Sequence, residues 1–390
     1  MTMNEKKLIL LGSTGSVGTQ AADVARARGN SVRAICAKSN VSAVEAQIRE
    51  FLPAAAAMSD PAAASALRTA VADLPVRVYS GVEGICEMIA DSDADTAINS
   101  IIGYAGLDPT LAVIDSGKDL ALANKESLVV AGEIVMSRAA ERGVDIAPVD
   151  SEHCAIDQCL RSGSRREIKK LIITASGGPF YGKKRSELSG ITVAEALAHP
   201  TWSMGAKITV DSATLMNKGF ELIEAAHLFG VNADRIKVIV HRESVIHSMV
   251  EFADNSVIAQ LSVPDMRLCV QYALNRPMRD AAVIEELDLC RISRLSFAEP
   301  DEDTFIPLRL ARQAQEAGGA SAAVLNAANE VAVWDFLSGK CRFTDIIDTL
   351  SYVCGEFASY SPSVRTLEGI READAAARDC ARGYLERIAR

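Results

Sequence analysis

The chain has 390 residues and a formal net charge of −10, with an isoelectric point near 5.2. This length allows two or three domains with a sizeable core. The acidic balance argues against nucleic acid or an anionic membrane as the main partner, because both are bound by clustered cations.

The cysteines and the N-terminal sequence indicate a cytoplasmic protein. Nine cysteines occur without a C-x-x-C pair, which favours reduced thiols over a disulfide framework or a zinc ribbon. No apolar run approaches the length of a membrane span, and the first lysines lead directly into a predicted strand instead of a cleavable apolar segment. We therefore expect no membrane partner and no nucleic-acid partner.

The first predicted elements are a strand, a glycine turn and a helix. An apolar strand is predicted over 7–11, and a helix over 19–28 follows the turn Gly12-Ser-Thr-Gly15-Ser-Val-Gly18. Glycines at such a turn let a pyrophosphate approach the helix N-terminus, although the spacing here is G-x-x-G-x-x-G instead of G-x-G-x-x-G. The segment predicts dinucleotide binding.

The second predicted strand, 31–37, ends at Lys38-Ser39-Asn40. A site specific for NAD would present Asp or Glu here to the ribose 2′-hydroxyl. A cation followed by two small hydrogen-bonding residues suits a 2′-phosphate instead, so we expect NADPH. The alternative is an ordinary solvated loop lysine.

Helices and short strands then alternate, which predicts a doubly wound parallel sheet of Rossmann-like α/β type over 1–150. Further strands are predicted over 76–79, 96–102, 119–122 and 144–149. Asn124-Lys125-Glu126 follows one of them, at the sheet edge where ligands bind. We expect Lys125 to face a substrate oxygen; alternatively it caps a helix or pairs with Glu126.

The strand over 144–149 ends in Asp150-Ser151-Glu152. In an extended chain, residues i and i+2 point the same way, so both carboxylates would face one cation. With Glu221 as a third ligand, the set suits Mg²⁺ or Mn²⁺, and Co²⁺ is a further option. The alternative is a solvated acidic loop.

The stretch from His199 to Glu224 is the richest in polar chemistry. We predict a short strand over 207–214 and a helix that opens at Asn217-Lys218-Gly219. A helix N-terminus favours anions, so Ser212, Asn217 and Lys218 are candidates for a phosphate site and Glu221 for a neighbouring metal. The alternative is a capped helix with a surface Lys–Glu pair.

Two loops complete the candidate site. The segment 199–206, HPTWSMGA, has apolar side chains without periodicity, which predicts a flap that closes over a ligand. A buried Trp202 that anchors a structural loop is the alternative. Ser176-Gly-Gly-Pro179 follows a strand that begins near Leu171, and we expect it to meet a phosphate or to form a plain turn.

The rest of the chain predicts a second sheet, a linker and a helical bundle. The resulting domains are 1–150, 151–274 with the flap 199–206, the linker 275–303 and the helical domain 304–390. The predicted strands are 237–240, 245–252 and 256–262, and the predicted helices are 308–317, 321–337, 343–352 and 367–388.

Nine motifs together resemble the 1-deoxy-D-xylulose 5-phosphate reductoisomerase family, and they run from the N-terminus to the last helices. They are LGSTGSVG, LANKESLV, VDSEH, TASGGPF, HPTWSMG, VDSATLMNKGFE, ESVIHSMV, VPDMR and LNAANE. The resemblance implies a homodimer with an NADPH domain, a catalytic domain with a flap and a C-terminal helical domain. It also implies metal-dependent rearrangement of 1-deoxy-D-xylulose 5-phosphate and NADPH-dependent reduction to 2-C-methyl-D-erythritol 4-phosphate.

The resemblance assigns site residues by position. For NADPH they are Thr14, Gly15, Ser16, Val17, Lys38, Ser39, Asn40, Asn124, Glu126 and Gly205. The metal ligands are Asp150, Glu152 and Glu221, with Lys125 and Ser151 at the substrate's oxygens. The phosphate pocket comprises Ser176, His199, Ser212, Asn217 and Lys218, and Trp202 and Met204 lie in the flap.

Three positions depart from the family's pattern, and two other functions stay open. Lys38-Ser39 replaces a glycine-bearing turn, Thr201 replaces a flap Asn, and Val263 replaces a Glu before Pro264. One alternative function is an NADP-linked dehydrogenase for another phosphorylated substrate, which needs no metal. The other is a regulatory NADPH sensor, which needs only the nucleotide loop.

Overall fold

The structure is a computed structural model that describes residues 6–388. The chain forms two compact units. The first contains residues up to Ser127 together with Val135–Cys154 and Asp265–Glu285, and the second contains Leu128–Ile134, Ala155–Pro264 and Glu286–Arg390.

The first unit is built on a sheet of seven parallel strands in the order β4-β3-β2-β1-β5-β6-β7. The order reverses beside β1, which is where ligands bind in sheets of this kind. The doubly wound α/β fold is therefore confirmed. The strands are β1 Lys7–Leu11, β2 Ser31–Ala37, β3 Ala55–Met58, β4 Arg77–Ser80, β5 Thr96–Asn99, β6 Asp119–Leu122 and β7 Ile146–Pro148.

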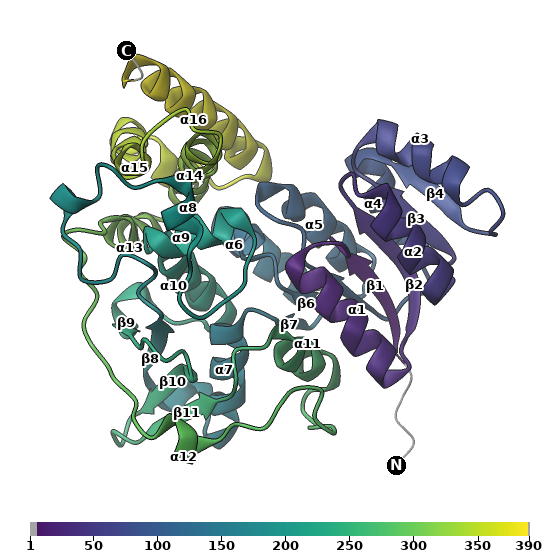
Figure 1. The fold of residues 1–390 in the computed structure, drawn as a ribbon, viewed down its shortest axis with the longest axis horizontal. Coiled ribbons are helices and arrows are strands. Elements are labelled where there is room, and N and C mark those ends of the chain that lie inside the picture. The colour runs from purple at the N-terminus through teal and green to yellow at the C-terminus, as the bar shows by residue number, and fades with distance from the viewer. Residues whose placement is uncertain (1–5, 389–390) are drawn as a thin grey trace. The chain divides into compact units, whose positions relative to one another are not determined.

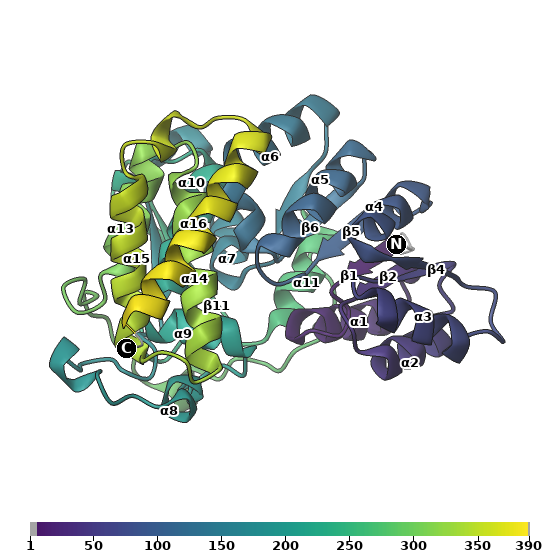
Figure 2. The same ribbon diagram turned by 90° about the horizontal axis from the view of Figure 1, so that it is seen from above.

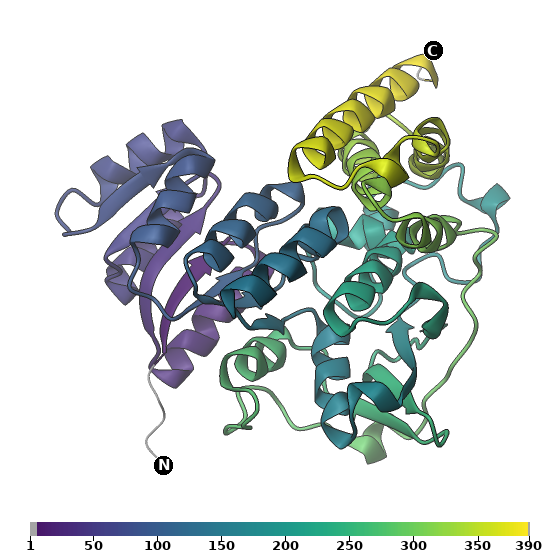
Figure 3. The same cartoon turned by 180° about the vertical axis from the view of Figure 1, so that it is seen from behind.

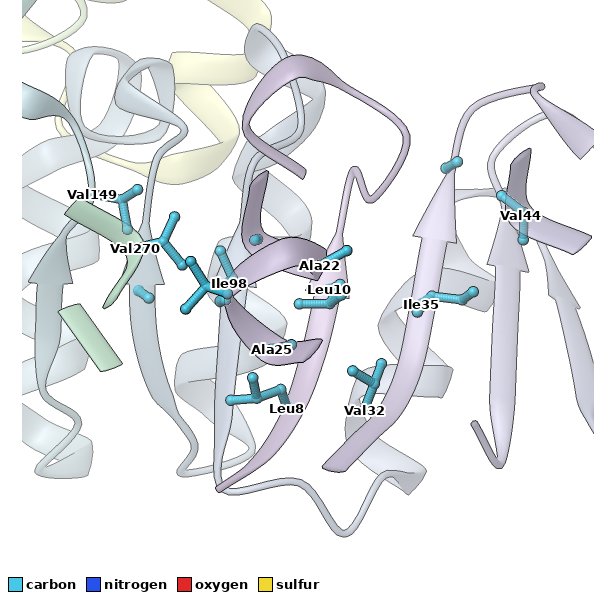
Figure 4. Packing of buried hydrophobic residues seen from close by; sticks show 14 of the residues in the cluster. Leu8, Leu10, Ala22, Ala25, Val32, Ile35, Val44, Ile98, Val149 and Val270 are labelled. Carbon is cyan, nitrogen blue, oxygen red and sulfur yellow. The ribbon is translucent and has the colours of Figure 1, made fainter. Parts of the chain in front are cut away.

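Helices cover both faces of this sheet (Figure 2). Ala22 and Ala25 of α1 pack with Leu8 and Leu10 of β1 in one buried cluster, which also holds Val270 of α11 (Figure 4). Small side chains on α1 let that helix lie close to the strands. The helices are α1 Ser16–Arg28, α2 Val41–Phe51, α3 Pro61–Ala70, α4 Gly81–Asp91, α5 Leu107–Asp115, α6 Lys125–Arg142 and α11 Met266–Asn275.

The second unit contains a four-stranded sheet in the order β11-β10-β8-β9. β8 is parallel to β9 and antiparallel to β10, and β10 and β11 form a hairpin. Asn255 in the hairpin turn has φ +67°. The strands are β8 Ile168–Ala175, β9 Ile236–Val240, β10 Ile246–Phe252 and β11 Val257–Leu261.

The predicted C-terminal helices are confirmed. α14 packs against both α15 and α16 (Figures 1 and 3), and most of the residues of α14 are buried. The helices are α7 Ser151–Cys159, α8 Val193–Leu197, α9 Ala206–Ala213, α10 Met216–Phe229, α12 Leu289–Ile292, α13 Pro307–Ala317, α14 Ser321–Leu337, α15 Phe343–Phe357 and α16 Leu367–Ile388.

Two local predictions are wrong. Residues 207–214 are not a strand but mostly helix α9, because Lys207 and Asp211 pair at helical spacing, with Nζ 2.8 Å from a carboxylate oxygen. Asp150-Ser151-Glu152 is not extended, because Ser151 begins α7 and the Cys154 N–H donates to the Asp150 carbonyl (2.8 Å). In both segments the alternation of residue types coincided with a helix.

Candidate active site

The glycine turn after β1 is held in a conformation that only glycine fits. Gly12 has φ +77°, and a Cβ there would lie 2.8 Å from the backbone of Ser100. A Cβ on Gly18 would lie 2.1 Å from the Gly12 carbonyl oxygen. Gly15 caps α1 without a side-chain hydrogen bond, so the first N–H groups of α1 face the turn as an anion site requires.

Thr14, Ser16 and Val17 lie on this turn, and none of the three is fully buried. Gln47 of α2 stabilises the turn through two hydrogen bonds. Ser13 Oγ donates to Gln47 Oε1 (2.6 Å), and Gln47 Nε2 donates to the Ser13 carbonyl (2.9 Å). Buried Ser13 is therefore structural, whereas Thr14, Ser16 and Val17 remain accessible to a ligand.

Lys38, Ser39 and Asn40 are exposed at the carboxyl end of β2. Asn40 is the N-cap of α2, and its side chain accepts the Ala43 N–H (3.2 Å). This leaves the Lys38 ammonium and the Ser39 hydroxyl at the same sheet edge as the glycine turn, which the predicted 2′-phosphate site requires.

Asn124 and Glu126 occupy the carboxyl end of β6 and are buried. Asn124 caps α6, and its Nδ2 donates to the carbonyls of Ile101 (2.7 Å) and Gly103 (2.9 Å) and to Glu126 (3.2 Å). Asn124 therefore fixes the loop after β5 beside the glycine turn.

Lys125 pairs with Asp150 at the carboxyl end of the parallel sheet. The Lys125 Nζ lies 2.5 Å from Asp150 Oδ2, and both side chains are buried. His153 Nδ1 lies 3.8 Å from the same oxygen, and Ser151 Oγ donates to Glu152. Buried charges persist only when they are compensated, so this acidic segment is not a solvated loop.

In the second unit, the start of α10 gathers three of the predicted site residues. Lys218 Nζ lies 2.5 Å from Glu221 Oε2, and Asn217 Nδ2 donates to Glu221 Oε1. All three side chains are buried. The alternative of a surface Lys–Glu pair is therefore wrong.

Ser212 lies near the end of α9, and the Ser176 turn packs directly against it. Gly177 and Gly178 have φ +76° and +65°, and a Cβ on Gly178 would lie 2.8 Å from the Ser212 carbonyl oxygen. Only glycine permits this approach of two backbones. The two predicted phosphate residues, Ser176 and Ser212, are thereby brought to adjoining segments.

His199 joins this turn to the flap. Its Nε2 lies 2.9 Å from Ser176 Oγ, and its Nδ1 accepts the N–H groups of Trp202 (2.9 Å) and Thr201 (3.3 Å). Because Nδ1 accepts, the ring proton of the neutral form lies on Nε2 and is donated to Ser176. Burial, with help from Lys218 and Arg242, lowers the pKa of His199 to about 4.

The other flap residues have fewer contacts. Trp202 is half-buried, and its ring meets His247 edge to face at 5.9 Å. Met204 and Gly205 are also half-buried, and Gly205 caps α9, where its carbonyl accepts the Thr209 hydroxyl (2.8 Å). No described contact links Met204 or Gly205 to the phosphate residues.

Sequence reasoning missed Arg242 and Asn329. Arg242 donates to two carbonyls of the Ser176 turn. Asn329 of α14 donates to the Asp211 carboxylate of α9 (2.7 Å). Arg242 lies in a loop without a periodic signal, so no local pattern pointed to it. The lysine and aspartate four residues apart in α9 were a usable helical signal.

Three family models match most of the chain. They are 1-deoxy-D-xylulose 5-phosphate reductoisomerase over residues 8–132, its C-terminal domain over residues 146–229, and a further DXP reductoisomerase C-terminal domain over residues 261–380.

Curated and solved proteins of the same name are similar over nearly their whole length. A reductoisomerase of Clostridium botulinum (strain Loch Maree / Type A3) is 48% identical over 96% of this chain and 98% of its own. One from Caldanaerobacter subterraneus subsp. tengcongensis is 51% identical over 88% and 91%.

Solved structures agree with this likeness. A DOX-P reductoisomerase in complex with NADPH, fosmidomycin and magnesium has a TM-score of 0.93 at 38% identity, covering 98% of this chain and 99% of that one. The Zymomonas mobilis enzyme in complex with NADPH has a TM-score of 0.90 at 39% identity, covering 98% and 100%.

Proposed function

Because the chain belongs to the 1-deoxy-D-xylulose 5-phosphate reductoisomerase family, we propose that the residues described above form the active site for that family's reaction. The enzyme isomerises 1-deoxy-D-xylulose 5-phosphate and reduces the product with NADPH to 2-C-methyl-D-erythritol 4-phosphate. The observation that carries this assignment is similarity across 96% of the chain to enzymes of this name.

NADPH binds at the carboxyl edge of the parallel sheet. We assign its phosphates to Thr14, Gly15, Ser16 and Val17 at the open N-terminus of α1. Lys38 and Ser39 hold the 2′-phosphate, since both are exposed at the end of β2. Asn124 and Glu126 border the same edge, and we propose Gly205 as a further residue of the NADPH site.

We assign a divalent metal, with Mg²⁺ as the first choice, to Asp150, Glu152 and Glu221. Asp150 and Glu221 are buried and Glu152 is half-buried, and hard cations of this kind prefer such oxygen donors. Solved relatives contain magnesium; Mn²⁺ and Co²⁺ accept the same donors. A metal held there would polarise substrate oxygens and stabilise negative charge on them.

Two lysines compensate these carboxylates within each unit. Lys125 lies 2.5 Å from Asp150, and Lys218 lies 2.5 Å from Glu221. Both ammonium groups are thus held at buried carboxylates that would bind the metal, and an ammonium group can donate up to three hydrogen bonds. We propose that Lys125 and Ser151 orient the reacting end of the substrate.

The substrate's phosphate binds to Ser176, His199, Ser212, Asn217 and Lys218. The first N–H groups of α10 and the Lys218 ammonium favour an anion there. Neutral His199 donates from Nε2 to Ser176 Oγ and leaves that hydroxyl free to donate to a phosphate oxygen. Binding energy at this remote group orients the reacting carbons.

The flap excludes water before hydride transfer. Trp202 and Met204 are half-buried rather than exposed, and His199 fixes the flap's first residues through two backbone N–H groups. Closure over the bound substrate protects the aldehyde and the hydride donor from solvent.

The domain division, oligomeric state and compartment are further proposals. We propose domains over 1–150, 151–274 and 304–390 joined by a linker over 275–303, in a cytoplasmic homodimer. Among residues 6–388, no helix combines the length and apolar character needed to cross a membrane.

Product identification tests the proposed reaction. Incubation with 1-deoxy-D-xylulose 5-phosphate, NADPH and Mg²⁺ should yield the branched 2-C-methyl-D-erythritol 4-phosphate, recognised by NMR of its methyl group on a quaternary carbon. An unbranched polyol phosphate would identify a simple NADP-linked dehydrogenase instead. NADPH binding without turnover would identify a sensor.

A further inference from the structure

Arg242 lies in the loop between β9 and β10 and forms hydrogen bonds to the turn of residues Ser176–Gly178. A single nitrogen, Nη1, donates to the carbonyls of Ser176 (2.7 Å) and Gly178 (2.8 Å). The guanidinium also lies over the ring of Tyr181, 5.1 Å from its centroid. Charge-assisted hydrogen bonds of this kind are stronger than those between neutral groups.

The conformation of the Ser176–Gly178 turn is not determined by its own backbone preferences alone. Gly177 and Gly178 both have positive φ, and consecutive glycines are conformationally free in the absence of other contacts. Ser176 Oγ contributes one local bond by accepting the Gly178 N–H (3.2 Å). Arg242 adds two long-range hydrogen bonds that favour this conformation.

On its other side the turn touches the phosphate residues. A Cβ on Gly178 would lie 2.8 Å from the Ser212 carbonyl oxygen, and Ser176 Oγ lies 2.9 Å from His199 Nε2. The trans peptide places the Gly177 N–H opposite the Ser176 carbonyl that Arg242 holds. Fixing the two carbonyls thus fixes both the Ser176 hydroxyl and this N–H.

The loop that carries Arg242 is itself anchored and reaches the flap. His241 Nε2 accepts the N–H groups of Val245 and Ile246 (both 3.2 Å), which closes the loop over 241–245. Ser244 Oγ lies 3.3 Å from Thr201 Oγ1 of the flap. The Arg242 loop therefore contacts both the turn and the flap.

We propose that Arg242 is a positioning residue of the phosphate pocket, which holds the Ser176–Gly178 turn against Ser212 and so sets the Ser176 hydroxyl and the His199 anchor of the flap. This inference rests on the proposed function, because it presupposes that the substrate's phosphate binds at Ser176 and Lys218. Arg242 acts through the turn: its described hydrogen bonds go to carbonyl oxygens, and its guanidinium lies over an aromatic ring.

Arg312 offers a matched control. Its Nη1 also donates to two backbone carbonyls, those of Ala233 (2.5 Å) and Ile236 (3.2 Å), and it is likewise half-buried. It contacts none of the phosphate residues in the described hydrogen bonds. Arg242→Met and Arg312→Met therefore remove the same kind of bridge at two different places.

The test is steady-state kinetics on both variants with inorganic phosphate as a competitive inhibitor. Arg242→Met should raise the KM for 1-deoxy-D-xylulose 5-phosphate and the inhibition constant of phosphate by about ten-fold, or about 1.4 kcal/mol of binding. The KM for NADPH should not change, and kcat should fall less than kcat/KM. Arg312→Met should leave both KM values, the inhibition constant of phosphate and kcat near those of the wild type. Arg242→Lys should recover part of the lost substrate binding because it keeps the charge and hydrogen-bond donors.

Equal effects of the two methionine variants, or an unchanged KM in Arg242→Met, would overturn the inference. If Arg242→Met does not fold, the same kinetic constants are compared between Arg242→Lys and Arg312→Lys. A raised substrate KM in Arg242→Lys alone would then support the inference, and equal effects would overturn it. Lys218→Ala separates the two levels of the proposal. An unchanged substrate KM in Lys218→Ala would contradict the proposed phosphate site itself. A raised substrate KM in Lys218→Ala together with wild-type kinetics in Arg242→Met would contradict the role of Arg242 alone.

Discussion

Lys218 and Glu221 form an ion pair one turn apart at the start of α10, with 7% and 1% of their side chains exposed and 2.5 Å between Nζ and Oε2. We assign them to different ligands, the lysine to the phosphate and the glutamate to the metal. Since removal of either partner takes an opposite charge away from the other buried charge, the effect of a substitution must be judged from ligand dependence and not from loss of activity alone.

Lys218→Ala should chiefly weaken binding of the phosphorylated substrate. Loss of one cation at a phosphate should raise the substrate KM by roughly ten-fold to a hundred-fold, with a smaller fall in kcat because phosphate binding also orients the reacting end. Added Mg²⁺ should not restore activity. An unchanged KM would contradict the proposed phosphate site, and rescue by extra metal would show that Lys218 serves the metal site instead.

NADPH should be preferred over NADH because of Lys38 and Ser39 at the end of β2. Each ten-fold of preference in kcat/KM corresponds to about 1.4 kcal/mol of differential binding in the transition state. Lys38→Ala should reduce this preference by lowering kcat/KM for NADPH only, and Lys340→Ala, which alters an exposed lysine of the helical region, is the control. Equal use of both cofactors by the wild type would refute the assignment.

Gly18→Ala should disrupt the nucleotide turn. A Cβ at this position would lie 2.1 Å from the Gly12 carbonyl oxygen, so the turn must shift, and the fluorescence-measured affinity for NADPH should fall. Gly383→Ala is the control, because a Cβ there meets open space inside α16 and should stabilise the helix by about 0.5–1 kcal/mol. Wild-type NADPH affinity in Gly18→Ala would contradict the described packing.

His199 should make stability depend on pH in a defined window. Burial first, then Lys218 and Arg242, lowers its pKa from 6.5 to about 4 in the folded protein. Between these values the unfolded chain binds a proton that the folded protein does not, so protons favour unfolding. The contribution is intact above pH 6.5 and is lost as the pH falls from about 6.5 to about 4.

Denaturant unfolding of the wild type and His199→Asn at several pH values measures this effect. The Asn side-chain oxygen can accept the Trp202 N–H as Nδ1 does, but it does not titrate. The free energy of unfolding of the wild type should therefore fall relative to that of the variant as the pH is lowered through the window. Parallel curves would show that His199 titrates alike in both states.

Sequence reasoning predicted what depends on local chemistry. The strand, turn and helix around Gly12 and Gly18 follow from the need for close backbone contact, and the structure has them at β1 and α1. The start of α10 at Asn217-Lys218 was also predicted, because an apolar period follows it. The doubly wound parallel sheet, and the place of each strand end at its carboxyl edge, then follow from the alternation of strands and helices.

Contacts between distant segments could not be predicted from the sequence. The α9 residues Ile208 and Val210 alternate with polar neighbours like a strand, but the Lys207–Asp211 ion pair and the Asn329 hydrogen bond to Asp211 favour a helix. Arg242 lies 66 positions from the Ser176 carbonyl that it holds, and its loop has no periodicity. Such partners are selected by tertiary packing, which no single segment encodes.

The most direct test of the central claim is NADPH oxidation with 1-deoxy-D-xylulose 5-phosphate as Mg²⁺ is returned to metal-stripped enzyme. Wild type should be inactive without metal and recover on addition. Glu221→Gln, which keeps the size but removes an anionic ligand, should need about ten-fold more Mg²⁺ or worse and turn over more slowly at saturating substrate, whereas Lys218→Ala should keep the wild-type metal requirement. Turnover by metal-free wild type, or wild-type metal dependence in Glu221→Gln, would contradict a site built on Asp150, Glu152 and Glu221.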